Sequence, residues 1–509
     1  MKKILILLSA VFVITTSVKA QNASRDKFIT DSLVPYINRA LTNWRIPGAA
    51  VCIVKDNKVV FMKGFGIKEL GLNNKVDENT LFMIGSNTKA FTATALAMLA
   101  NAKKLSLDDK VTKYIPEFKL DSKPATELAT VRDLLCHRLG FQTFQGDFTF
   151  YNSNLSREDI ISRMALLKAP YSFRTRWGYT NSAFLTAGEI IPKVAKQNWD
   201  IYLKEKIFAP LGMGNTLGLS VAMQKALNRS VPHTISDGRL IAIPYANLDN
   251  MAPAGAISST ANDMSKWVLA LLNEGKVGKK EIIPQAAINA TRQPQDIVGT
   301  EVHLDGEVNY QLYGLGWFLQ DYHNHRIVMH DGGISGYVSS VTLVPKDNLG
   351  IVILTNTDQN SLYDALRWEI MDAYFKLPYR NYSDVYLKDF KKYASEEMAE
   401  DKKKRDSVLL NPRTAQSISY YTGKFTNPIY GSVNIEMADN NTLNMRFEHH
   451  PKMYARLQPL GGNRFYATFS DPVFGKGVFN FIVQPNGKVT GIRVKVADFV
   501  EQGAYEFTR

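Results

Sequence analysis

The chain is poor in cysteine, with only Cys52 and Cys136 among its 509 residues. Two cysteines cannot supply the several bridges of a disulfide-rich fold, and this pair does not have the spacing of zinc ligands. Both occur in apolar segments, at 49–54 and 131–136, where free cysteines are commonly buried. We therefore expect two free thiols, although an oxidising compartment would permit a bridge.

Long hydrophobic runs are also missing. The longest apolar stretch, residues 4–15, is shorter than the about 20 residues that a membrane-spanning helix needs. It follows Lys2 and Lys3 and precedes Val18-Lys19-Ala20, a pattern typical of an export signal. We expect cleavage after Ala20, no membrane span, and a periplasmic or secreted product. No cysteine follows the signal directly, so a lipid anchor is not expected.

Positive charge is in excess but is not concentrated. The 61 Lys and Arg outnumber the 48 Asp and Glu and give a net charge of +13. These cations are dispersed or lie in the mixed run 396–405, whereas a nucleic-acid site would gather them on one face. We expect no nucleic-acid partner. No cluster of His, Cys and carboxylate residues has metal-ligand spacing, so neither a metal nor a cofactor is expected.

The chain is long enough for two domains, because single cores stop growing at about 250–300 residues. After the signal at 1–20, residues 21–378 carry strand-like runs at both ends and a helical middle, which predicts an α+β domain. Charged residues dominate 379–412, interpreted as a linker. Short alternating strands in 413–509 predict a small antiparallel barrel or sandwich. The expected strands of the first domain are 50–54, 58–62, 339–344 and 350–354, and its expected helices are 90–100, 182–191 ending before Pro192, and 262–272.

A candidate nucleophile lies at Ser86-Asn87-Thr88-Lys89, between an apolar run and an Ala-rich helix. Residues three apart share a helix face, so Lys89 should lie beside the Ser86 hydroxyl and activate it. Ser24-Arg25-Asp26-Lys27 has the same spacing but lacks this context. Ser86 is therefore the preferred nucleophile.

Two further elements could complete a site around this pair. Tyr-x-Asn occurs several times, for example at Tyr36, Tyr179 and Tyr245, but only Tyr179-Thr180-Asn181 follows Trp177-Gly178 and opens an apolar helix. His330-Asp331-Gly332-Gly333 directly precedes the terminal hairpin, and its glycines would let a substrate backbone approach closely. We expect Tyr179, Asn181 and the His330 segment to face Ser86.

Together these three motifs resemble those of the serine β-lactamase and penicillin-binding protein superfamily, in its class C-like branch of esterases and D-peptidases. The resemblance covers roughly residues 25–378. It extends to 134–137, 207–213, 253–255 and 313–317. The segment beginning at Tyr421-Thr422-Gly423 more weakly resembles a lipocalin-like domain found behind some such hydrolases.

The resemblance implies a role for each matching residue. Ser86 would attack a carbonyl, Lys89 would take its proton, and Tyr179 would relay a proton to the leaving group. Asn181 and the segment of His330 and Gly332 would orient the substrate. The backbone N–H groups of Ser86 and Gly333 would form the oxyanion hole.

His330 occupies a position where most β-lactamases carry lysine. A mostly neutral imidazole removes a permanent anchor for the carboxylate of penicillins and D-Ala peptides, which favours esters or other peptides as substrates. Because free histidine titrates near pH 6.5, activity on an anionic substrate is predicted to fall as pH rises through that value. Lys89 must itself have a lowered pKa to act as a base, since free lysine has a pKa of about 10.4.

Other polar residues have structural interpretations. His137 is expected to be a hydrogen-bonded core residue, and His449 and His450 to lie on the surface of a barrel loop. Tyr313 and Trp317 could equally line a substrate groove or pack a strand.

The chain departs from the family pattern at two places. Phe173-Arg174 replaces the usual Pro-Gly before the tyrosine motif, and Arg138-Leu139 replaces small residues after His137. These changes could narrow the cleft.

The leading hypothesis is an exported serine hydrolase of esters or D-amino-acid peptides, with a small molecule or peptide as its substrate. The alternatives are a true β-lactamase or D,D-carboxypeptidase, and a non-catalytic protein that binds peptide or cell wall. Nothing in the sequence specifies an oligomeric state.

Overall fold

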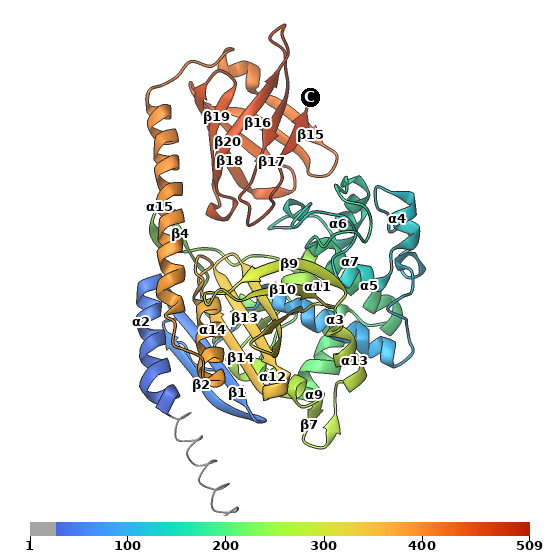
Figure 1. Ribbon diagram of the computed structural model, residues 1–509. Helices are drawn as coiled ribbons and strands as arrows, with labels where there is room; N and C mark the ends of the chain where they lie inside the picture. Colours follow the sequence, from blue (N-terminus) through green and yellow to red (C-terminus); the bar gives the residue numbers. More distant parts are fainter. Residues whose placement is uncertain (1–26) are drawn as a thin grey trace, which may run out of the picture.

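The computed structural model describes residues 27–509, so the predicted signal at 1–20 and Ser24 lie outside the described residues. Figure 1 shows a mixed α/β domain with a separate barrel beside it, joined by one long helix. The expected α+β class is confirmed. No helix in the described part of the chain is both long and apolar enough to span a bilayer.

The first domain is built on an eight-stranded antiparallel sheet with the order β2-β1-β14-β13-β12-β11-β10-β9. The predicted N-terminal hairpin and the predicted hairpin near residue 345 are adjacent, because β1 pairs with β14. The strands are β1 (Gly48–Lys55), β2 (Lys58–Gly66), β9 (Asp296–Val302), β10 (Val308–Tyr313), β11 (Phe318–Tyr322), β12 (His325–Ile334), β13 (Tyr337–Val344) and β14 (Leu349–Thr355).

Both faces of the sheet centre are buried, which explains why β1 is apolar at consecutive positions. Val51 and Ile53 pack with the helices on one face, and Cys52 and Val54 with those on the other. Alternate residues of a strand point to opposite faces, so a strand covered on both sides has no polar face. Helices α2 (Val34–Trp44) and α14 (Leu362–Phe375) cover the first face, and α3 (Thr88–Asn101) and α12 (Ala261–Leu272) lie on the second.

The helical middle of the domain packs around α3. Its remaining helices are α4 (Lys123–Leu128), α5 (Val131–Leu135), α6 (Arg157–Arg163), α7 (Asn181–Ala195), α8 (Trp199–Leu203), α9 (Ala209–Leu211), α10 (Ser220–Met223), α11 (Ala252–Gly255) and α13 (Gln285–Thr291). Three small two-stranded sheets join β3 (Phe82–Met83) to β6 (Ser258–Ser259), β4 (His233–Ser236) to β5 (Arg239–Ala242), and β7 (Lys276–Val277) to β8 (Lys280–Glu281).

Two expected helix ends are corrected. Helix α7 does not end before Pro192 but continues through it to Ala195. Lys196 then ends the helix in a left-handed conformation and donates its N–H to Pro192 O. Helix α12, expected from residue 262, begins at Ala261 and is capped by the Thr260 side chain, which accepts from Asp263 N–H.

The segment predicted as a linker is a continuous helix. Helix α15 (Tyr382–Leu409) is 28 residues long and begins where the Asn381 side chain accepts from Asp384 N–H. Ion pairs one turn apart, such as Lys402 with Asp406 at 2.5 Å, suit an exposed helix. Figure 1 shows α15 rising from the sheet domain along the side of the barrel.

The C-terminal domain is a closed antiparallel barrel of strands β15 to β22 in sequential order. The sequence left barrel and sandwich open, and the structure has the barrel. Its strands are β15 (Gly423–Asn427), β16 (Gly431–Asp439), β17 (Thr442–Phe447), β18 (His450–Gly461), β19 (Arg464–Phe469), β20 (Lys476–Val483), β21 (Val489–Val494) and β22 (Tyr505–Thr508).

Both cysteines are free and buried, as expected. Burial raises the pKa of each thiol to about 12, so neither is a reactive thiolate.

Candidate active site

Ser86 lies in a short 3₁₀ turn, η2 (Gly85–Asn87), that leads directly into α3. Gly85 has φ of +50°, a conformation that glycine adopts at little cost. A Cβ at Gly85 would also lie 3.1 Å from Gly333 N, so glycine allows this turn to abut β12. Ser86 remains partly exposed at the head of an otherwise buried helix.

Lys89 is completely buried one turn later, and its Nζ lies 3.0 Å from Ser86 Oγ. The same Nζ donates to Asn181 Oδ1 at 2.6 Å and to the backbone oxygen of Ala254 at 2.9 Å. Burial lowers the pKa of Lys89 to about 7, against a smaller opposing effect of Asp147. A neutral amine that donates to those two oxygens has its lone pair free for the proton of Ser86.

Tyr179 and Asn181 lie at the start of α7 and reach the same point. Lys89 Nζ is 4.6 Å from the centre of the Tyr179 ring. Burial raises the pKa of the Tyr179 phenol, although a hydrogen bond with Ser86 lowers it. Tyr179 therefore remains protonated at neutral pH and can pass a proton onward rather than act as a permanent phenolate base.

His137 holds this loop in place, in agreement with its predicted structural role. Its ring is buried, and its Nδ1 accepts from Thr180 N–H at 3.0 Å. The ring also lies 4.3 Å from that of Tyr179, measured between centroids. The competing Tyr-x-Asn motifs lie elsewhere, since Tyr36 accepts from Ser383 N–H and Tyr245 donates to Ser230 O.

The glycines of the third motif fit the nucleophile turn against β12. A Cβ at Gly332 would lie 1.9 Å from Ile84 O, so only glycine is tolerated there. The sequence predicts that these glycines let a substrate backbone approach closely. In the structure, the backbone of Ile84, just before Ser86, packs against Gly332. Gly333 is exposed next to Gly85. Pairing between β11 and β12 ends at Met329, which leaves the edge of β12 beyond it open on that side.

Contrary to the prediction from the sequence, His330 does not lose a charge near pH 6.5. Its ring is 1% exposed, its Nδ1 lies 2.6 Å from Asp331 O, and its Nε2 lies 3.1 Å from the Tyr313 hydroxyl. Burial, assisted by the charge of Lys89, lowers the pKa of His330 to about 3. The imidazole is therefore neutral throughout the physiological range, and the predicted loss of charge near pH 6.5 is wrong.

Tyr313 and Trp317 are both fully enclosed, which favours the packing interpretation over a groove lining. The Tyr313 hydroxyl nevertheless touches His330 and so orients a residue of the third motif.

Sequence reasoning missed Asp147, which follows no motif. Asn181 Nδ2 donates to Asp147 Oδ2 at 2.6 Å, so Asp147 orients the amide whose oxygen meets Lys89. Burial raises the pKa of Asp147 well above its usual range, although the Asn181 hydrogen bond opposes this. Asp147 and Ala254 O thus complete the polar surroundings of the amine.

The two segments that differ from the family pattern each place an arginine against the same buried carboxylate, that of Asp133. Arg138 Nε lies 2.5 Å from Asp133 Oδ1, and Arg174 contacts both Asp133 oxygens at 2.9 and 2.6 Å. Arg174 has φ of +63°, the left-handed conformation in which the family's glycine would be relaxed. Both arginines therefore tie the segments after α5 and before Tyr179 to Asp133 of that helix.

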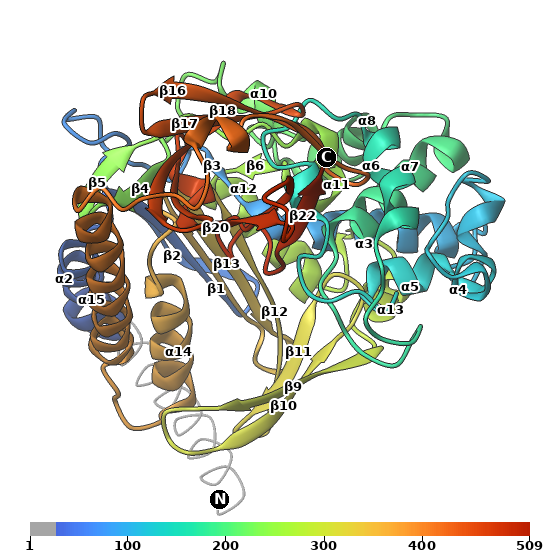
Figure 2. The same ribbon diagram turned by 90° about the horizontal axis from the view of Figure 1, so that it is seen from above.

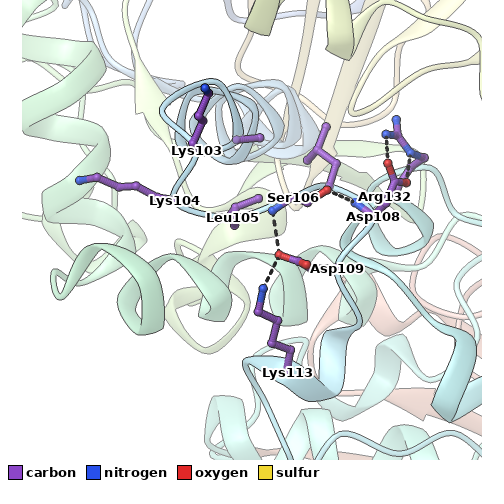
Figure 3. Close-up of a pocket in the computed structure, with 10 residues that line it drawn as sticks. Lys103, Lys104, Leu105, Ser106, Asp108, Asp109, Lys113 and Arg132 are labelled. Carbon is purple, nitrogen blue, oxygen red and sulfur yellow. Dashed lines mark hydrogen bonds and ion pairs between the residues drawn. The ribbon is translucent and has the colours of Figure 1, made fainter.

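A surface hollow of about 540 Å³ lies at the opposite end of α3 from Ser86, beside Ala100. Its charged residues are largely paired, Arg132 with Asp108 and Lys113 with Asp109 (Figure 3). The hollow is separate from the residues around Ser86.

Among the described residues, Asp305, Glu307 and His323 form one set with metal-ligand chemistry, with ligand atoms within 4.8 Å of one another. His323 Nε2 already lies 2.8 Å from Asp305 Oδ2, and Arg380 lies 3.6 Å from the same oxygen. This set is on the β9–β10 hairpin and the turn before β12, not at Ser86.

The partly exposed Ser86, the buried Lys89 beside it and the facing Tyr179-Thr180-Asn181 suit a serine hydrolase-type enzyme, and the comparisons with known proteins support that class. A profile of the beta-lactamase family matches residues 35–375, so the chain belongs to this family, within the superfamily of serine β-lactamases and penicillin-binding proteins. A second profile, of a domain of unknown function named DUF3471, matches residues 410–508.

Relatives of known name are similar over much of the chain. The unguisins hydrolase ungD' of Aspergillus campestris is 27% identical over 417 residues, which cover 78% of this chain and 76% of that protein. Protein flp of Staphylococcus aureus strain N315 is 28% identical over 322 residues, which cover 63% of this chain and 61% of that protein.

Solved structures support the fold. The octameric penicillin-binding protein homologue from Pyrococcus abyssi aligns with a TM-score of 0.60 at 20% identity, covering 93% of this chain and 98% of that one. A D-stereospecific amidohydrolase from Streptomyces sp. aligns with a TM-score of 0.52 at 20% identity, covering 64% of this chain and 94% of that one.

Proposed function

We propose that this protein is an exported serine hydrolase that forms an acyl-enzyme on Ser86 and acts on esters or peptides, including D-amino-acid peptides. The observation that carries the proposal is the environment of Lys89. Its amine lies 3.0 Å from Ser86 Oγ, has two other acceptors for its own hydrogens, and has a pKa lowered to about 7 by burial.

The reaction follows from these positions. Neutral Lys89 takes the Ser86 proton as Oγ attacks the carbonyl carbon, and the N–H groups of Ser86 and Gly333 stabilise the resulting oxyanion. Tyr179 passes the proton to the leaving group as its bond to carbon breaks. Water then attacks the acyl-enzyme and releases the acid. One oxyanion donor contributes about 100 to 1,000-fold and a positioned base about 100 to 10,000-fold.

The site suits substrates that carry no carboxylate, because it offers no cation to bind one at the third motif. The third motif presents a buried neutral His330 rather than a cation. One sequence relative is an unguisins hydrolase and one structural neighbour is a D-stereospecific amidohydrolase, which also supports amide or peptide hydrolysis. A β-lactamase activity is the second candidate, because the family profile bears that name.

Labelling with a fluorophosphonate, followed by peptide mass spectrometry, tests the nucleophile. We expect one adduct, on Ser86, that Ser86→Ala abolishes and Ser24→Ala retains. Ser24 is the matched control because it has the same spacing to a lysine. A panel of short-chain esters, D-amino-acid peptides and nitrocefin then identifies the substrate class. An unlabelled parent protein would support a binding protein instead.

The proposed export has its own test. N-terminal sequencing of the protein expressed in a bacterial host should begin at Gln21, and an uncleaved Met1 would refute it.

A further inference from the structure

The barrel contacts the catalytic domain immediately beside the candidate active site. Phe148, in the short turn η4 (Asp147–Thr149), is fully buried among aromatic rings of the barrel. Its ring stacks on His450 with centroids 4.2 Å apart and lies 5.6 Å from Tyr505. His450 is thus buried at 2% exposure, which corrects its expected place on the surface.

Glu501 ties the barrel to the same turn. It lies in the connection between β21 and β22, residues 495–504, and is 2% exposed. Its two oxygens accept from Gly146 N–H at 2.8 Å and Phe148 N–H at 3.0 Å, and Tyr430 donates to it at 2.6 Å. These two N–H groups flank Asp147, whose side chain meets Asn181.

This anchored connection places Phe499 over the open end of β12. A Cβ at Gly333 would lie 3.4 Å from Phe499 Cε2. The Phe499 ring also meets the edge of Tyr151, with centroids 6.1 Å apart. Tyr151 in turn is hydrogen-bonded to Ser335, in the turn that follows β12. Figure 2, seen from above, shows the barrel lying over the centre of the catalytic domain.

The exposure of Phe499 is unusual for its position. Its neighbour Val500 is 1% exposed and Val496 is 2% exposed, whereas Phe499 is 43% exposed. The ring is therefore held from below by Gly333 and Tyr151 and keeps a free apolar surface. Such a surface beside a candidate oxyanion donor is positioned to contact a bound acyl group.

We propose that Phe499 is a specificity-determining residue, through which the barrel forms one wall of the substrate cleft and limits the size of the acyl group. The inference rests on the proposed function, which places the reacting carbonyl at Gly333. Because that carbonyl stays in place in the acyl-enzyme, the group attached to it lies next to the Phe499 ring. Small linear acyl groups fit below the ring, and branched ones collide with it.

The test uses the full chain and p-nitrophenyl esters that share one leaving group, with acetyl, butanoyl and 3,3-dimethylbutanoyl as acyl groups. One extra or missing methylene in a hydrophobic pocket changes kcat/KM about 10 to 200-fold. We expect Phe499→Ala to raise the ratio of branched to acetyl ester kcat/KM about tenfold and Phe499→Trp to lower it. Asp498→Ala is the matched control, since Asp498 is exposed on the same connection and pairs with the exposed Lys495.

A branched-to-acetyl ratio within twofold of the parent in both Phe499 variants would overturn the proposal while leaving the serine hydrolase assignment intact. A parent protein that hydrolyses no ester and is unlabelled at Ser86 would instead refute the proposed function, and the inference with it. The two Phe499 variants move the ratio in opposite directions, which general loss of folding cannot do.

Discussion

The rate of Ser86 acylation should be governed by the protonation state of Lys89 and be half-maximal near pH 7. Burial lowers the pKa of Lys89 from 10.5 to about 7. A lysine of pKa about 10.4 is neutral in about one molecule in 2,500 at pH 7, whereas a pKa near 7 makes about half the molecules neutral. The buried site therefore gains about a thousandfold in active base, equivalent to roughly 4 kcal/mol.

The assay is the second-order rate constant of fluorophosphonate labelling, measured from pH 5 to 9.5. Below pH 7 the rate should rise tenfold per pH unit, because each unit raises the neutral fraction of Lys89 tenfold. Above pH 7 it should reach a plateau. A midpoint above pH 9 would refute the reasoning, because it would mean that the enclosure by Asn181, Ala254 and the Tyr179 ring leaves the amine as basic as a free one.

Three further predictions concern charge and anchoring. Because the pKa of His330 is lowered to about 3, the ratio of kcat/KM for anionic and neutral esters should stay constant from pH 5.5 to 8. A fall in this ratio through pH 6.5 would show instead that His330 titrates there. Glu501→Gln offers one acceptor oxygen to two flanking N–H groups, so its free energy of unfolding in urea should fall by about 1–3 kcal/mol. The control Glu506→Gln, at an exposed position, should change that free energy by less than about 0.5 kcal/mol. An equal effect of both would contradict the anchor. Arg174→Gly relieves the strain of a left-handed backbone, about 1 kcal/mol, but removes charge-assisted hydrogen bonds to buried Asp133 that contribute about 1.5–3 kcal/mol. Thermal melting should therefore show a net loss of stability of about 1 kcal/mol. A gain in stability would show that the backbone strain is the larger effect.

The parts of the site that depend on local geometry were predictable from the sequence. Residues three apart across a helical turn lie near each other, and Lys89 Nζ, one turn beyond the 3₁₀ turn that holds Ser86, is within hydrogen-bond distance of Ser86 Oγ. The position of Tyr179 followed from its context at the start of a helix. Hairpins were equally local: Asp56 and Asn57 both have positive φ in the tight turn between β1 and β2, as their types allow.

The electrostatics of the third motif were not predictable, because burial depends on packing from distant segments. His330 has one partner from its own strand and another, Tyr313, from β10. A sequence pattern identifies an imidazole but not the enclosure that lowers its pKa. The unexpected helix α15 has a different cause, since charged residues typical of a linker also form a stable exposed helix when their charges pair one turn apart.

The contact between the barrel and the site was the least accessible to sequence reasoning, and it changes what the barrel can do. Glu501 and Gly146 are 355 positions apart, and neither belongs to a motif. A buried carboxylate that accepts three hydrogen bonds is costly to pull away, because each donor would lose its partner. An appended module that merely bound cell wall would need no such bond beside Asp147. The two domains are therefore coupled at the turn that orients Asn181, and a change in the barrel that shifts Glu501 should reach Lys89 through only two intervening side chains.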